Sequence, residues 1–229
     1  MQTIRSIPRL PEGLAQKSLT ASKRLARRAG FTLIEILAVI LIIGVLAATL
    51  IPMVTETIAA SKVTGCSANL QELYKGIQLY EIKYKELPRE SGVRYFGQLY
   101  SRKAMENTKT NAERLTCPAV DRGFLTIGTL PWEEWWSDLE SIDGTYSAYA
   151  GRDTVHYPLK TLSGNEPLIA DDNEGGMNHP TTTNVLYGDG RVHPLELELL
   201  REEGVLTEDE PLLVGPESQV DELRKLSLD

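Results

Sequence analysis

Hydrophobic residues are concentrated in one run near the N-terminus. Residues 31–54 contain a single charged side chain, Glu35, in 24 positions. About 20 apolar residues are enough for a helix to cross a bilayer, so the run predicts a membrane-spanning helix. A signal peptide is the alternative, but its apolar region usually has about 7–15 residues before a cleavage site of small residues. Ala47-Ala48-Thr49 matches such a site only weakly.

An amphipathic pattern follows this run. Apolar residues recur in steps of three and four, which places them on one face of a helix: Val63, Cys66, Leu70, Leu73, Ile77, Tyr80, Tyr84 and Leu87. Pro88 should end the helix, because the residue before a proline disfavours helical geometry. Pro52 should kink or loosen it. We expect one helix over residues 31–87, roughly 85 Å long at about 1.5 Å per residue, whose second half packs on a globular domain.

Shorter patterns in the rest of the chain indicate a small sheet. Residues 95–100 predict a short helix or loop. Alternation or short apolar runs predict strands at residues 145–150, 168–170, 184–187 and 191–195. The last two flank Gly188-Asp189-Gly190, which is typical of a hairpin turn. The expected fold is therefore α+β, with a long N-terminal helix laid on a small antiparallel sheet.

The pattern divides the chain into four parts. These are a leader (1–30), an apolar helix (31–54), an α+β domain (55–195) and an acidic C-terminal tail (196–229). In the tail we expect a charged helix from Leu195 to about Glu203, a linker, and a second short helix over residues 218–226, all peripheral. Three tryptophans at positions 132, 135 and 136 form either core packing or a ligand platform.

Charge is distributed asymmetrically along the chain. The formal net charge is −8, yet residues 1–30 hold seven basic side chains and one acidic one. A positive flank before an apolar helix predicts that the N-terminal end lies in the cytoplasm and the body outside it. The acidic body should repel nucleic acid rather than bind it.

The junction between leader and apolar run carries a recognisable motif. Gly30-Phe31-Thr32-Leu33-Ile34-Glu35 after basic residues resembles the processing site of type IV prepilins and type II secretion pseudopilins. Pro52 is the 22nd residue counted from Phe31, where these proteins commonly carry a helix-loosening proline. The resemblance implies cleavage after Gly30 by a prepilin peptidase and N-methylation of Phe31.

The position of Glu35 fits this resemblance. A carboxylate inside hydrocarbon is costly unless it is paired or lies near the interface. Cleavage would give Phe31 a positively charged amine, which Glu35 of a neighbouring subunit could neutralise. The alternative is an unpaired Glu35 that reaches the membrane surface. Small residues such as Gly44 would let helices approach closely in a filament.

A second resemblance lies near the C-terminus. His179, nine further residues, and then Asp189-Gly190 resemble the signature of a bacterial group of prepilin-like proteins, the H-X9-DG type. Segments beginning at Cys66 and Cys117 also resemble that group. We interpret His179 and Asp189 as structural, with Asp189 bonding backbone in the turn and His179 pairing with it or with a nearby strand. No convincing nucleophile completes a catalytic triad with them.

Metal and disulfide chemistry stay open at this level. Clustered oxygen ligands at Asp171, Asp172, Asn173 and Asp189 could hold calcium, as the resemblance to major pseudopilins also implies, or form a solvated acidic loop. Cys66 and Cys117 are either one disulfide or two separate buried thiols. The three histidines and two distant cysteines do not make a zinc pattern.

The resulting hypothesis is a structural one. The chain is expected to be a subunit of a pilus or of a secretion pseudopilus, without catalysis and without a required cofactor. The implied partners are its own copies, other pilins or pseudopilins, a prepilin peptidase, an inner-membrane assembly platform and, before assembly, membrane lipid. The rival hypothesis is a membrane-anchored extracytoplasmic binding or enzymatic domain that uses the helix only as a tether.

Overall fold

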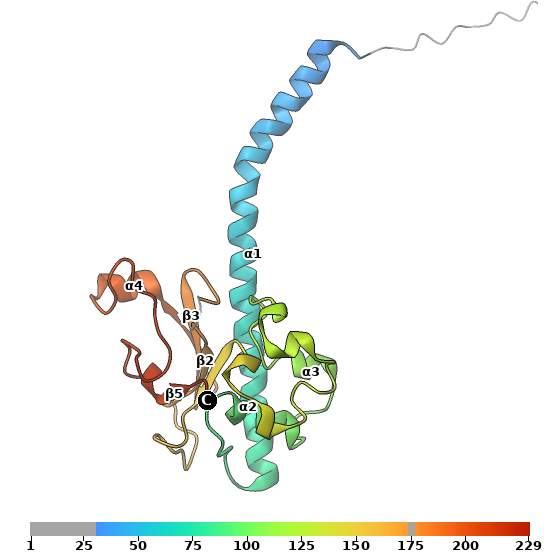
Figure 1. Cartoon of the computed structure of the whole chain (residues 1–229). Helices are drawn as coiled ribbons and strands as arrows, with labels where there is room; N and C mark the ends of the chain where they lie inside the picture. Colours follow the sequence, from blue (N-terminus) through green and yellow to red (C-terminus); the bar gives the residue numbers. More distant parts are fainter. Residues whose placement is uncertain (1–30, 174–176) are drawn as a thin grey trace, which may run out of the picture. The chain divides into compact units, whose positions relative to one another are not determined.

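The computed structural model describes residues 31–173 and 177–229, and Figure 1 shows the chain. The chain divides into two compact units, residues 1–47 and residues 48–229. The long helix α1 (Leu33–Tyr84) begins in the first unit and ends in the second. The expected leader, residues 1–30, lies outside the described residues.

Helix α1 has 52 residues and continues through Pro52. Its last turn closes where the amide of Lys85 donates to the carbonyl of Glu81 (2.8 Å). Lys85 then adopts a left-handed backbone with φ of 60°, a conformation that commonly terminates helices. The helix therefore ends three residues before the predicted end at residue 87, and Pro88 is not what stops it.

The second half of α1 buries the predicted apolar face. The residues on this face that are at most 1% exposed are Cys66, Leu70, Leu73, Ile77 and Tyr80. Val63 and Tyr84, at the two ends of the face, are half-buried. The steps of three and four thus correctly identified the side of the helix that packs on the remainder of the second unit.

The sheet is five-stranded and antiparallel, with strand order β4-β3-β2-β1-β5. Its strands are β1 (Tyr149–Arg152), β2 (Pro167–Asp171), β3 (Thr182–Tyr187), β4 (Val192–Glu196) and β5 (Leu226–Ser227). The α+β prediction is confirmed, as are the strand at residues 168–170 and the hairpin. The two shortest α-helices, α3 (Lys109–Glu113) and α4 (Leu197–Glu202), and the predicted helix near residue 95, α2 (Val93–Ser101), complete the α-helical elements described.

The strand predicted at residues 145–150 begins later than expected. Residues Gly144–Tyr146 form a short 3-10 helix instead. Asp143 causes this, because its Oδ1 accepts hydrogen bonds from both the amide (2.9 Å) and the hydroxyl (2.6 Å) of Thr145. Further 3-10 turns, Arg122–Phe124, Thr126–Thr129 and Leu139–Ser141, fill the segment that carries the tryptophans. Trp136 is fully buried and donates to the carbonyl of Ala112 (2.9 Å), which supports the core interpretation.

The hairpin turn between β3 and β4 packs against α1. Asp189 Oδ1 accepts the amide of Arg191 (2.9 Å), as predicted for a residue in the turn. The hydroxyl of Tyr74 donates to the carbonyl of Gly188 (3.1 Å). Gly190 has φ of +85°, and a Cβ there would lie 2.5 Å from the Tyr74 ring. The turn therefore needs glycine at position 190 for its backbone and for its contact with the helix.

The prediction of a peripheral C-terminal tail is wrong. Leucines of the tail are buried among the strands: Leu206, Leu212, Leu223 and Leu226. The predicted helix over residues 218–226 is replaced by a 3-10 turn (Leu223–Lys225) and strand β5, which pairs with β1. The tail belongs to the same compact unit as the sheet, because its scattered leucines cover an apolar surface that the strands leave open.

Candidate functional site

The first candidate site is the start of α1. The Oε2 atom of Glu35 accepts hydrogen bonds from the amide and the hydroxyl of Thr32, both at 2.8 Å. The amide of Glu35 in turn donates to the Thr32 hydroxyl (3.3 Å). This reciprocal pattern is a capping box, which satisfies helix amides that have no partner within the helix. The T-x-x-E spacing of Thr32 and Glu35 is the sequence signal that predicts this cap.

Phe31 lies directly before this cap and is 79% exposed. Gly30, on the other side of the predicted cleavage bond, lies outside the described residues. The structure thus places the predicted first residue of the mature chain next to a capped helix start. Glu35 therefore accepts hydrogen bonds at its own helix start. Charge pairing with a neighbouring amine and the alternative of a carboxylate that reaches the membrane surface both stay predictions.

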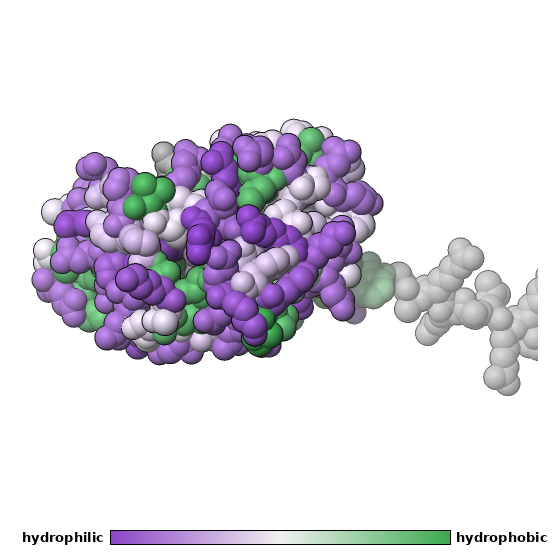
Figure 2. Space-filling view, turned by 90° about the horizontal axis from the view of Figure 1, so that it is seen from below, coloured by the Kyte–Doolittle hydropathy of each residue, from purple (hydrophilic) through white to green (hydrophobic). Residues whose placement is uncertain are grey.

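The apolar segment of α1 presents large hydrophobic side chains outward on all sides. Those at least 50% exposed between positions 33 and 46 are Leu33, Ile34, Ile36, Leu37, Ile40, Leu41, Ile42, Ile43, Val45 and Leu46. By length and composition this helix could cross a membrane. By contrast, the face of the second unit seen in Figure 2 is mostly hydrophilic. A fully apolar helix surface requires a nonpolar environment, either lipid or neighbouring helices.

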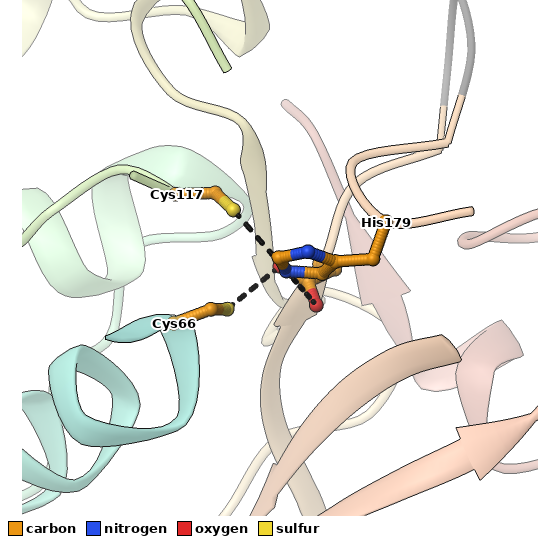
Figure 3. A group of neighbouring side chains, drawn as sticks. Cys66, Cys117 and His179 are labelled. Carbon is orange, nitrogen blue, oxygen red and sulfur yellow. Dashed lines mark hydrogen bonds and ion pairs between the residues drawn. The ribbon is translucent and has the colours of Figure 1, made fainter. Parts of the chain in front are cut away.

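The second candidate site is a buried cluster of four side chains in the second unit. Cys66 on α1, Cys117 in the loop after α3, Asp171 at the end of β2 and His179 before β3 are each at most 1% exposed. Their sulfur, oxygen and nitrogen atoms all lie within 4.8 Å of one another. Figure 3 shows both cysteines pointing toward the His179 ring.

Hydrogen bonds connect the four residues. The Cys66 thiol donates to Asp171 Oδ1 (2.9 Å), and Cys117 Sγ lies 3.4 Å from His179 Nε2. That same nitrogen is 3.5 Å from Asp171 Oδ2. Donors outside the cluster hold the carboxylate, since Asn184 gives Oδ2 both its amide and its side-chain nitrogen, each at 2.9 Å. The cluster is thus a connected polar network inside an apolar core.

The protonation equilibria of the cluster are strongly perturbed. Burial raises the pKa of the Cys66 thiol. The interaction with the neighbouring Cys66 thiol lowers the pKa of Cys117 to about 7, and the contact with His179 acts in the same direction. Burial disfavours the charged form of His179, but the bond to Cys117 and the charge of Asp171 outweigh burial and raise its pKa. Cys117 is therefore the thiol that ionises more readily.

The structure decides several alternatives that the sequence left open for these residues. His179 pairs with a nearby strand rather than with Asp189, because its Nε2 lies 3.5 Å from Asp171 Oδ2 at the end of β2. The two cysteines are buried free thiols, which agrees with the second alternative and not with a disulfide, and the fold brings their sulfur atoms close together. The three histidines and two distant cysteines show no zinc pattern in the sequence, yet the fold brings Cys66, Cys117 and His179 together with Asp171, and these residue types can bind a metal ion.

The residues considered for calcium do not form one ligand set. Asp171 ends β2, whereas Asp189 lies in the hairpin turn beyond Tyr187, which pairs with Pro167 at the start of β2. Asn173 uses its side-chain nitrogen to hold Thr183 and the carbonyl of Leu212, each at 2.8 Å. The amide of Asp172 donates to the carbonyl of Ala148. These contacts give Asp171, Asn173 and Asp189 separate structural roles among the described residues.

Comparison with known proteins is informative for the N-terminal part of the chain. Residues 25–51 match the prokaryotic N-terminal methylation motif. The chain is also 34% identical over 61 residues to competence protein ComGC of Halalkalibacterium halodurans, a match that covers 27% of this chain and 60% of that protein. No solved structure matches the chain significantly. The motif, the ComGC similarity and the long helix on a small antiparallel sheet together support a pilin-like chain.

Proposed function

We propose that this chain is a structural subunit of a type IV pilus-like filament or of a type II secretion pseudopilus. A prepilin peptidase would cleave it after Gly30, and Phe31 would then be N-methylated. The observation that carries the proposal is the prokaryotic methylation motif over residues 25–51, which coincides with an exposed apolar helix that begins at a cap two residues after the expected cut. The similarity to a competence protein supports the same class of assembly.

The exposed apolar segment explains how such a subunit would change environment. Before assembly, lipid would surround the outward side chains of residues 31–54, with the basic leader on the cytoplasmic side of the inner membrane. In the filament, the same side chains would contact the helices of other pilins or pseudopilins. The polar second unit would remain in the periplasm or at the filament surface. An inner-membrane platform would move subunits between these two states.

Glu35 would provide register in the filament. Its bonds from Thr32 both use Oε2, and among the described residues none donates to Oε1. After cleavage the α-amine of Phe31 is a cation close to this carboxylate on each subunit. Pairing of the amine with Glu35 of a neighbouring subunit would neutralise both charges inside an apolar filament core. The role requires no active site and no cofactor.

The capping box allows an assay that separates the two roles of Glu35. Glutamine also serves in a capping box, so Glu35→Gln keeps the cap and removes the charge, whereas Glu35→Ala removes both. Glu56→Gln, at an exposed position of the same helix, is the matched control. Filament yield is measured by electron microscopy and by shearing, at equal levels of processed subunit in the membrane.

We expect Glu35→Gln and Glu35→Ala to lose filaments to a similar extent and Glu56→Gln to keep them. Normal filaments from Glu35→Gln together with loss in Glu35→Ala would show that only the cap matters, against the proposed charge pairing. Full function after replacement of residues 1–54 by an unrelated membrane anchor would refute the filament role and favour the tether hypothesis.

A further inference from the structure

We propose that Cys66, Cys117, Asp171 and His179 form a structural zinc site. The proposal rests on the buried cluster in the second unit and does not depend on filament assembly. The four side chains supply two sulfurs, one imidazole nitrogen and one carboxylate oxygen within 4.8 Å of one another. These are the donor types that zinc takes in proteins, usually four at a time and in tetrahedral geometry.

The spacing of the donors fits a tetrahedral zinc ion. Bond lengths of about 2.3 Å to sulfur and about 2.0–2.1 Å to nitrogen or oxygen place ligand atoms roughly 3.3–3.8 Å apart. Cys117 Sγ lies 3.4 Å from His179 Nε2, and that nitrogen lies 3.5 Å from Asp171 Oδ2. The Cys66 sulfur is closer to Asp171 Oδ1, at 2.9 Å, because its thiol proton lies between them. Metal binding would release that proton and let the two atoms separate.

Groups around the cluster are arranged as metal ligands require. Asn184 holds the Asp171 carboxylate with two hydrogen bonds. The Tyr149 hydroxyl donates to Cys66 Sγ and the Ala119 amide donates to Cys117 Sγ, both at 3.4 Å. Such donors orient the ligands and stabilise thiolate charge, which is how outer groups support metal sites. Zn²⁺ would replace two thiol protons, which pass to solvent, and leave a site of net charge −1 that these donors offset.

The two sulfur ligands indicate which metal ion the site would bind, and the burial of all four ligands indicates whether the site is structural or catalytic. Calcium prefers six to eight oxygen ligands, so two sulfurs exclude it here. Four protein ligands that are at most 1% exposed leave no position for water or substrate, which marks a structural rather than a catalytic zinc site. The ligands come from α1, the loop after α3, β2 and the segment before β3. The ion would therefore fasten the helix to the sheet, and its binding energy would be folding energy.

The direct test uses the full chain, purified in detergent without added metal or chelator. We expect about one zinc ion per chain by inductively coupled plasma mass spectrometry. X-ray absorption should show two sulfurs at about 2.3 Å and two lighter atoms at about 2.0–2.1 Å. After exchange with Co²⁺, a thiolate-to-cobalt band and the visible bands of tetrahedral Co²⁺ should appear. Protein isolated without zinc and with a Cys66–Cys117 disulfide, or zinc without sulfur ligands, would overturn the proposal.

Variants provide a second test. Tyr149→Phe removes one hydroxyl and keeps the ring, and it should weaken zinc binding about 10-fold. His179→Gln should weaken it further, beyond 100-fold, whereas His193→Gln, at an exposed position, should bind zinc like the unchanged protein. Affinity is measured by competition with a chromogenic chelator, and circular dichroism checks that each variant is folded. Equal zinc affinity in His179→Gln and His193→Gln would mean that the metal binds elsewhere, which would refute the site.

Discussion

Gly190 should be one of the least replaceable positions of the hairpin. Its φ of +85° lies where an L side chain is strained, and an added Cβ would meet the Tyr74 ring at 2.5 Å. A left-handed backbone costs a residue other than glycine about 1–2 kcal/mol. Forcing extra atoms into packed structure typically costs about 1–3 kcal/mol. Gly190→Ala should therefore destabilise the second unit by about 2–5 kcal/mol.

Gly204 provides a matched control for the backbone contribution. It also has a positive φ, +74°, but a Cβ there would meet nothing within 4 Å. Gly204→Ala should cost only the backbone strain, about 1–2 kcal/mol. The difference between the losses of unfolding free energy in the two variants measures the contribution of the contact between the hairpin turn and α1. The ring should not move aside freely, because its hydroxyl is bonded to the carbonyl of Gly188.

The assay is urea unfolding of the detergent-solubilised chain, followed by tryptophan fluorescence. All three tryptophans lie in the second unit, so the signal reports that unit. In a Tyr74→Ala background, Gly190→Ala should lower the free energy of unfolding by no more than Gly204→Ala does, because the ring that the added Cβ would meet is absent. Equal losses of stability for Gly190→Ala and Gly204→Ala in the unchanged background would refute the argument.

Two further predictions concern the interior of the second unit. Burial alone would raise the pKa of Glu166, but its bonds to Lys225 and buried Arg152 outweigh burial and lower that pKa. Glu166→Gln should cost about 1.5–3 kcal/mol at neutral pH. The stabilisation by ionised Glu166 is present above its unfolded pKa of about 4.3 and is lost as the pH falls through its lower folded pKa. Urea unfolding between pH 7 and pH 3 should therefore show the free energies of unfolding of the unchanged protein and of Glu166→Gln converging. A difference that stays constant with pH would contradict this. Leu212→Ala should cost about 2–5 kcal/mol, because Leu212 is fully buried, whereas a change near zero would mean that the tail is peripheral after all.

Periodic patterns predicted those parts of the fold that depend on local geometry. The steps of three and four identified the buried face of α1, and the Gly188-Asp189-Gly190 turn between two apolar runs identified the β3–β4 hairpin. The error at residues 145–150 arose where a single side chain, Asp143, redirects the backbone. Alternation of apolar residues carries no information about such a cap.

The buried cluster and the tail depend on contacts that no local pattern encodes. Cys66 and Asp171 are 105 residues apart in sequence, yet their side chains form a hydrogen bond. The pairing of His179 with Cys117 required the fold to bring two separate loops together. In the tail, Leu212 belongs to the short apolar run Leu212-Leu213-Val214 between Pro211 and Gly215. Three residues are too few to show either helical or strand periodicity.

The most direct test of the central claim is the N-terminus of the mature protein, measured by mass spectrometry on chain isolated from the membranes of its own cells. The methylation motif at residues 25–51 and the helix cap at Thr32 lead us to predict a chain that begins at Phe31, with one methyl group on its α-amine. A chain that retains Met1 and the leader, or one cut near Ala48, would contradict the proposed function.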